Sequence, residues 1–168
     1  MIVFSNDQRR REPVLYILFI VLLVFVPGAA IRTAIVALLG LRLLSLLYSL
    51  LAPRAVAVTR LTDTVYANCH QRFEVTLRIR NRSVVPIYLM SVQDTVSSGI
   101  FADDEAAFRV TLQPLETRDI SYRAVGRARG AYAAGPVRLE GYDPLRTYRF
   151  RRLVESPLRI IVYPTVHR

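Results

Sequence analysis

Lysine is absent from this sequence, and all 23 of its basic residues are arginine. Without lysine, a phosphate-binding loop of the type GxxxxGKS or GxxxxGKT cannot be completed. The single cysteine excludes a disulfide framework and a thiolate metal cluster. The two histidines, His70 and His167, are too few for a typical zinc site. These absences remove several common enzyme classes before any pattern is considered.

Nucleophilic catalysis finds no support in the sequence either. No serine lies in a GxSxG frame, and Cys69 and His70 are adjacent, so on a strand their side chains would point to opposite faces. The acidic cluster Asp103-Asp104-Glu105 is interpreted as a solvated loop tip, with weak cation binding as the alternative. We therefore expect a protein that is not an enzyme, with no catalytic, cofactor-binding or metal-binding residues.

Apolar residues are abundant and unevenly distributed. Of the 168 residues, 52% are hydrophobic, which excludes a disordered chain. Residues 14–31 form an uncharged run that would be ~27 Å long as a helix, close to the ~30 Å thickness of membrane hydrocarbon. Residues 33–52 form a second run, in which many leucines offset the cost of Arg42. Because Pro27-Gly28 is a natural break, the sequence predicts a transmembrane helical hairpin over 14–52, with spans at 14–31 and 33–52.

Polar residues in the second run fall on one stripe of the predicted helix. Arg42, Ser45 and Ser49 are spaced three and four residues apart. We expect this stripe to face the partner helix or the polar headgroup zone.

Basic residues flank the predicted hairpin on both sides. They are Arg9, Arg10 and Arg11 in the N-terminal segment 1–13, and Arg54 and Arg60 after the second run. The positive-inside rule then places the segment 1–13 and the soluble part of the chain in the cytoplasm. The expected location is a bacterial inner membrane crossed by two helices.

A cleaved signal peptide is the alternative interpretation of the first run. Residues 9–11 would be its basic region, residues 14–26 its apolar region, and Gly28-Ala29-Ala30 its cleavage site. The second apolar run argues against this interpretation, because a secreted domain would not need it. The alternative would make the protein an anchored domain that faces the cell envelope.

Residues 53–168 have the texture of an all-β domain. Polar and apolar residues alternate at 72–80, 108–112 and 119–124, as in half-buried strands. Weaker strand candidates are 55–61, 87–92, 135–139, 148–150 and 158–163, with turn residues at 81–83, 113–116, 126–130 and 142–144. Pro86 marks an edge strand or the start of a strand. Seven or eight short strands predict an immunoglobulin-like, two-sheet sandwich.

Four motifs in the second half of the chain follow one order and spacing. They are Arg129-Gly130-Ala131-Tyr132, Gly135-Pro136-Val137-Arg138-Leu139, Asp143-Pro144 and Val162-Tyr163-Pro164. This sequence resembles the N-terminal half of the bacterial domain-of-unknown-function 58 family. The resemblance covers most of the chain, from about Leu15 to Tyr163. It departs from the family after Asp143-Pro144, where the family carries glycine and aromatic residues and this chain has residues 145–150.

The resemblance implies an architecture and a set of partners. Family members begin with a two-helix membrane hairpin, continue into an immunoglobulin-like domain, and end in a region related to von Willebrand factor A. This sequence stops at Arg168 and lacks that last region. The resemblance further implies MoxR-type AAA ATPases and von Willebrand A-type proteins as partners, and it brings no agreed biochemical activity.

The family motifs also have a structural interpretation. Gly130 and Gly135 can supply positive φ angles, and Pro136 interrupts the ladder of strand hydrogen bonds. Tyr132 would close the end of the sandwich with its hydroxyl bonded to backbone, and Asp143-Pro144 would start a turn. The alternative is a loop that docks a partner.

The net charge of +10 bears on the choice of partner. The β-domain carries two arginine clusters, one at 72, 78, 80 and 82 and the other at 146, 149, 151 and 152. Arginines on the polar faces of strands are one interpretation, and attraction to an anionic membrane leaflet is the other. Nucleic acid is not expected, because the aromatic residues do not form a stacking platform.

Two functional hypotheses from different classes follow. The first is a non-catalytic, membrane-anchored scaffold whose strand edges or end loops bind partner proteins. The second is an accessory subunit or truncated part of a membrane enzyme or chaperone system. A third hypothesis is a binding module that faces the cell envelope, and it depends only on which side of the membrane the β-domain lies.

Overall fold

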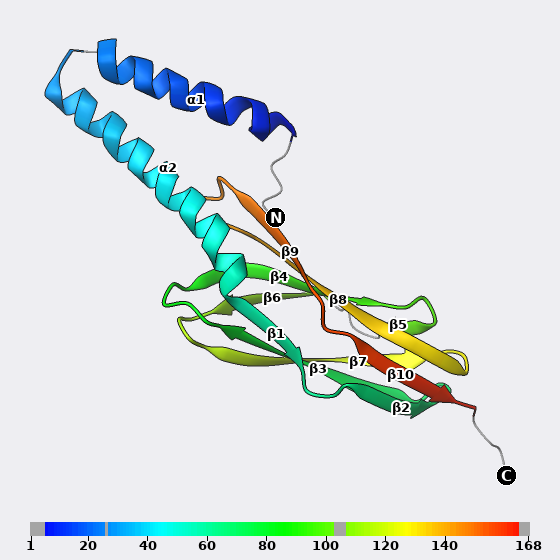
Figure 1. The fold of residues 1–168 in the computed structure, drawn as a ribbon. Coiled ribbons are helices and arrows are strands. Elements are labelled where there is room, and N and C mark those ends of the chain that lie inside the picture. The colour runs from blue at the N-terminus through cyan, green and yellow to red at the C-terminus, as the bar shows by residue number, and fades with distance from the viewer. Residues whose placement is uncertain (1–5, 26, 103–106, 165–168) are drawn as a thin grey trace.

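Two helices form a hairpin that projects from one end of a β-sandwich (Figure 1). The computed structural model describes residues 6–25, 27–102 and 107–164, with side chains from Pro13 onward. Helix α1 is Asn6–Phe25 and helix α2 is Ala29–Ala55. The strands begin directly after α2, so no linker separates the hairpin from the sandwich.

The expectation of two membrane spans is wrong. Within the described residues, α2 is the one helix long and apolar enough to cross a membrane, whereas the apolar part of α1 is limited to Pro13–Phe25. Thirteen residues make a helix only ~20 Å long, which is shorter than the ~30 Å hydrocarbon layer. The break at Pro27-Gly28 divides the expected span 14–31, so Ala29, Ala30 and Ile31 belong to α2 instead.

Ten strands follow the helices. Their bounds are β1 Val56–Arg60, β2 Thr64–Asn68, β3 Arg72–Asn81, β4 Ile87–Val96, β5 Ile100–Ala102, β6 Ala107–Leu112, β7 Thr117–Gly126, β8 Gly130–Tyr142, β9 Arg149–Val154 and β10 Leu158–Tyr163. The three alternating segments correspond to β3, β6 and β7, and Pro86 immediately precedes β4 as a strand start. Strands β2 and β5 were not expected, and β8 is much longer than the predicted 135–139.

The strands form two packed sheets of an immunoglobulin-like sandwich, as predicted. One sheet has the order β1-β3-β7-β5, and the other has the order β2-β10-β8-β4-β6, with β9 also paired to β8. All pairs are antiparallel except β2 with β10, which run parallel. The hydrophobic core lies between the sheets, where alternate side chains such as Leu77, Ile79, Val92, Leu139 and Ile160 are fully buried.

The strand registers define the end of the sandwich that carries the helices. Val56, the first residue after α2, pairs with Asn81, and Arg80 pairs with Thr117. The turns 82–86 and 113–116 therefore lie beside the end of α2, and the loop 143–148 joins them there through its contacts with the helices. We call this the helix-proximal end, and the opposite end, where β10 finishes, the distal end (Figure 1).

Candidate interaction surface at the helix-proximal end

The loop between β8 and β9 is bonded to both helices. Asp143 is buried, and its carboxylate accepts hydrogen bonds from the Ser45 hydroxyl of α2, from Leu145 N at 3.1 Å and from Tyr148 N at 2.5 Å. The Tyr148 hydroxyl lies 3.3 Å from the Tyr16 hydroxyl of α1. Asp143-Pro144 thus starts a turn, as predicted, and the same turn positions both helices.

The polar stripe on α2 therefore has a different role from the expected one. Ser45 and Ser49 are buried and Arg42 is half-buried, and Ser45 binds Asp143 of the β-domain. At Ser45 the expectation that this stripe faces the partner helix or the headgroups is wrong, because Asp143 of the sandwich binds the Ser45 hydroxyl. The pattern marked a polar face correctly, but spacing along one helix cannot reveal which neighbour covers that face.

Two further contacts fix the end of α2. Arg152 of β9 donates from one guanidinium nitrogen to Pro53 O at 2.5 Å and to Val56 O at 3.0 Å. These carbonyls belong to the last turn of α2 and its continuation, where main-chain oxygens lack helical partners. A cation at this position also opposes the negative end of the helix dipole. The Tyr48 hydroxyl adds a bond of 3.0 Å to Pro86 O at the start of β4.

Several large apolar side chains are exposed at the helix-proximal end. Val84 is 79% exposed, Leu115 is 59% exposed and Leu89 is 60% exposed. Leu89 and Leu115 also have positive φ angles of 45° and 60°. This backbone conformation disfavours leucine by roughly 1–2 kcal/mol relative to the right-handed region. Leu89 adopts it where the register of β4 against β6 shifts, and Leu115 adopts it at the third position of a turn.

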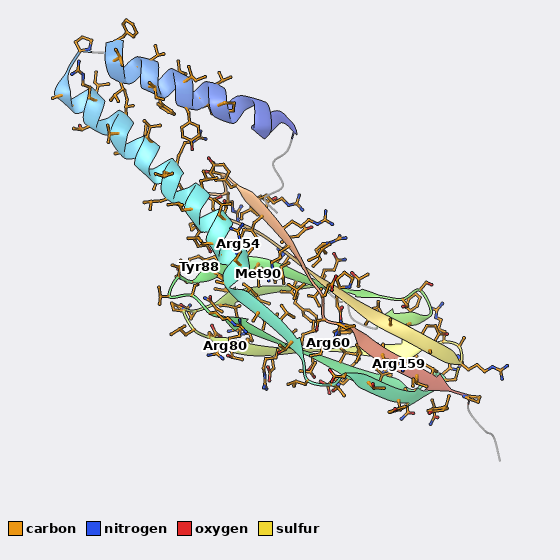
Figure 2. All side chains as sticks on the ribbon, viewed as in Figure 1. Arg54, Arg60, Arg80, Tyr88, Met90 and Arg159 are labelled. Atoms are coloured by element: carbon orange, nitrogen blue, oxygen red, sulfur yellow. The ribbon has the colours of Figure 1, made fainter. Side chains whose placement is uncertain are left out.

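A hollow of ≈ 960 Å³ lies on the outer face of the larger sheet, next to the β8–β9 loop. Its rim includes Tyr88, Leu89, Arg109, Glu140, Tyr142, Arg146 and Arg149. Figure 2 shows Tyr88 at this end of the molecule, whereas Arg159 lies toward the distal end. The hollow is thus lined by basic groups, tyrosines and one exposed leucine.

Some of the charged side chains that line this hollow form ion pairs and others do not. Glu140 is paired with Arg149 at 2.5 Å and with Arg151 at 3.2 Å. Within the described residues, no ion pair is found for Arg109 or Arg146, and both are exposed. The only other acid in the lining, Asp143, is buried and already accepts three hydrogen bonds. Two guanidinium groups therefore remain available to an anionic ligand.

The basic residues expected at the membrane have varied positions. The expectation for Arg60 is wrong: its side chain is only 2% exposed and binds the fully buried Asp94 inside the sandwich (Figure 2). Desolvation by burial, together with its hydrogen bond to Asp94, raises the pKa of the neighbouring Tyr122. Arg54 is exposed on the last turn of α2. The side chains of Arg9, Arg10 and Arg11 lie outside the described part of the chain.

Gly130 and Gly135 have the positive φ angles expected for them, and the Tyr132 hydroxyl is bonded to backbone as expected. Gly130 and Gly135 have φ angles of 155° and 107°, and the Tyr132 hydroxyl donates to Ala128 O at 2.9 Å. The pairing of β4 with β8 shifts opposite Gly135-Pro136, and β8 changes its other partner there from β10 to β9.

The remaining motif residues lie at the distal end. Arg129 and Pro164 are exposed, and the Tyr163 ring stacks on Tyr66 with 6.3 Å between ring centroids. They are therefore separated from the hollow by the length of the sandwich.

The residues considered for catalysis are not assembled into a site. Cys69 and His70 lie in the turn between β2 and β3, and the half-buried Cys69 thiol is 3.4 Å from Arg127 O. Asp103-Asp104-Glu105 lies outside the described residues. Among the side chains that are described, no group of three metal-binding residues is found.

Sequence reasoning missed Leu89, Leu115, Arg109 and the capping role of Arg152. One signal was present for Leu115: Pro114-Leu115 occupies the centre of a turn closed by Glu116 N to Gln113 O at 3.2 Å. With proline second and a positive φ third, this is the pattern of a type II turn, where glycine is the usual third residue. Pro114 indicated the turn, but the positive φ of Leu115 is known only from the structure.

The fold defines an immunoglobulin-like sandwich joined to an N-terminal helical hairpin. No family model matches this chain, and no curated protein matches its sequence. Solved structures of similar fold include the CARDB domain of a Pyrococcus furiosus protein, at 14% identity and a TM-score of 0.45, covering 66% of this chain and 94% of that one. They also include PapD-like domain 7 of human CEP192, at 11% identity and a TM-score of 0.43, covering 67% and 87%. A third is the Clostridium thermocellum cohesin Coh-OlpC, solved with a dockerin, at 9% identity and a TM-score of 0.40, covering 66% and 94%. These similarities concern the general sandwich arrangement alone.

Proposed function

We propose that this protein is a non-catalytic scaffold in which the apolar helix α2 anchors a β-sandwich to a bacterial inner membrane. The observation that carries this proposal is the bond between Asp143 of the sandwich and Ser45 of α2. This bond, the Arg152 contacts and the absence of a linker make the apolar helix and the sandwich one unit. Such a unit would hold the sandwich at a defined height on the membrane surface.

The proposal also covers the partners. With the helix-proximal end toward lipid, the distal end and the free edges of β5 and β6 would face the aqueous phase, where a protein could add a strand or dock on loops. The resemblance to the domain-of-unknown-function 58 family suggests a MoxR-type ATPase or a von Willebrand A-type protein as the partner. In a variant of this proposal, the protein is an accessory subunit of a membrane enzyme system, and its partner performs the catalysis.

The side of the membrane on which the sandwich lies is the next part of this proposal. We propose the cytoplasmic side, because arginines flank the hairpin at both ends.

Cysteine labelling in cells tests the side of the membrane. Cys69 is half-buried, so the reporter is the exposed Ser98→Cys in a Cys69→Ser background, and Cys69→Ser alone is the unlabelled control. A membrane-impermeant maleimide should label Ser98→Cys only after the cells are permeabilised. Labelling of intact cells would overturn the cytoplasmic location and favour the envelope-facing module.

Retention in washed membranes tests the anchor itself. The full chain should stay in the membrane pellet after extraction with alkaline carbonate, because burial of the apolar helix does not depend on charge. Release into the supernatant would overturn the membrane-anchored scaffold.

A further inference from the structure

The hollow at the helix-proximal end lies where lipid headgroups would be. The loop 143–148 is bonded to Ser45 of α2 and to Tyr16 near the middle of α1, so it lies beside the part of α2 that approaches the sandwich. Pro144 and Arg146 of the same loop line the hollow. The hollow is therefore at the depth of the headgroup layer if α2 is embedded in lipid.

The chemistry of the lining fits an anionic, phosphate-containing group. Arg109 and Arg146 are exposed and have no ion-pair partner among the described residues. Guanidinium groups bind phosphate oxygens through paired, charge-assisted hydrogen bonds. Glu140 does not compete for them, because Arg149 and Arg151 already bind its carboxylate.

The apolar part of the lining fits a lipid better than a soluble anion. Tyr88, Tyr142 and Leu89 are exposed on the rim of the hollow. Tyrosine is enriched where a membrane meets water, because its ring is apolar and its hydroxyl is polar. Leu89 is held in a left-handed conformation that presents an apolar side chain where glycine would relieve strain.

We propose that this hollow binds the headgroup of an anionic phospholipid, with Arg109 and Arg146 contacting its phosphate and the tyrosines and Leu89 contacting its glycerol and upper acyl region. This inference rests on the proposed membrane anchor and adds a specific lipid site to it. The bound lipid would fix the rotation of the sandwich about α2, and with it the direction in which the distal end faces.

Native mass spectrometry of the full chain in detergent tests the site, with dihexanoyl-phosphatidylglycerol and dihexanoyl-phosphatidylcholine as probes. The anionic lipid should bind about tenfold or more tightly than the zwitterionic one, as expected for one or two charge-assisted contacts. The preference should fall to about twofold or less in Arg109→Gln/Arg146→Gln. Equal binding of the two lipids by the unmodified chain would overturn the proposal.

The matched control is Arg123→Gln/Arg159→Gln, which removes the same charge from two exposed arginines outside this hollow. It should keep the lipid preference, and an equal loss in the control would show general electrostatic attraction and overturn the site. Inorganic phosphate distinguishes a lipid from a soluble anion: binding as tight as that of the anionic lipid would overturn the lipid assignment. If the chain stays in carbonate-washed membranes but shows no lipid preference, only this lipid site is refuted. If the chain is released from the membranes, the membrane anchor is refuted.

Discussion

Arg60 of β1 and Asp94 of β4 form a two-pronged ion pair between the sheets, with N···O distances of 2.7 and 2.8 Å. Tyr122 of β7 donates to the same carboxylate at 2.6 Å, and Arg60 Nε donates to Ser156 O at 2.6 Å. Side chains from both sheets and the main-chain carbonyl of Ser156 in the β9–β10 connection thus meet in the interior. Each polar group in this cluster has a hydrogen-bond partner. Removal of Arg60 or Asp94 would therefore leave the opposite charge buried in the apolar core without compensation.

We predict that the pair is more sensitive to loss of one partner than to loss of both. Asp94→Ala should lower the free energy of unfolding by about 3–5 kcal/mol, because the Arg60 guanidinium stays buried without its anion. Arg60→Met/Asp94→Leu should cost less than the single variant. Urea unfolding of the full chain in detergent, followed by circular dichroism, measures both. A double variant less stable than Asp94→Ala would contradict this account.

Tyr122 predicts a loss of stability at alkaline pH. Burial and the bond to Asp94 raise the pKa of this phenol above its usual value of about 10. Above pH 10 the unfolded chain therefore releases a proton that the folded chain keeps, so stability present below pH 10 falls as the pH rises. Unfolding free energies at pH 8, 10 and 11 should show this fall, and Tyr122→Phe should show a smaller one. An identical pH dependence in the variant would rule out this cause.

Arg152 predicts a local change at the end of α2. Arg152→Ala removes a cation that binds Pro53 O and Val56 O, at a cost of about 1.5–3 kcal/mol. Amides of residues 53–58 should exchange hydrogen faster in the variant than in the unmodified chain. Arg159→Ala is the control, because Arg159 is exposed on β10. Unchanged exchange in Arg152→Ala would show that other contacts end the helix.

We predict that position 135 does not tolerate a side chain. A Cβ there would lie 2.8 Å from Ser156 O, and the φ of 107° is unfavourable for any other residue. Gly135→Ala should lower the unfolding free energy by at least ~1–3 kcal/mol. Gly40→Ala is the matched control, since a Cβ on Gly40 of α2 meets nothing within 4 Å and alanine favours a helix. Equal thermal stability of the two variants would contradict the prediction.

Local patterns account for what was predicted correctly. The alternation in β3, β6 and β7 follows from one face of each strand being buried, and that pattern lies within ten residues of chain. The break at Pro27-Gly28 and the turn at Asp143-Pro144 depend on backbone preferences of single residues. Strand β2 was missed, and it joins the sheet through a parallel pairing with β10, far along the chain.

The errors concern residues whose environment is made by distant segments. Arg60 follows the apolar run in sequence and was therefore expected at the membrane, yet its partner Asp94 comes from the other sheet. Ser45 was expected to face the partner helix or the polar headgroup zone, yet it is bonded to Asp143 of the sandwich. The hollow likewise joins Arg109 of β6 with Arg146 of the β8–β9 loop, which no spacing rule connects.

By itself, the sequence determined the class of this protein: an apolar N-terminal hairpin, an all-β domain, and a set of turns specified by glycine, proline and aspartate. These properties depend on periodicity and backbone preference, which each short segment carries alone. The tertiary structure decided which arginines are buried, how the hairpin is bonded to the sandwich, and which charges share a surface. Those outcomes depend on sheet register and packing, because they bring together side chains separated by tens of residues.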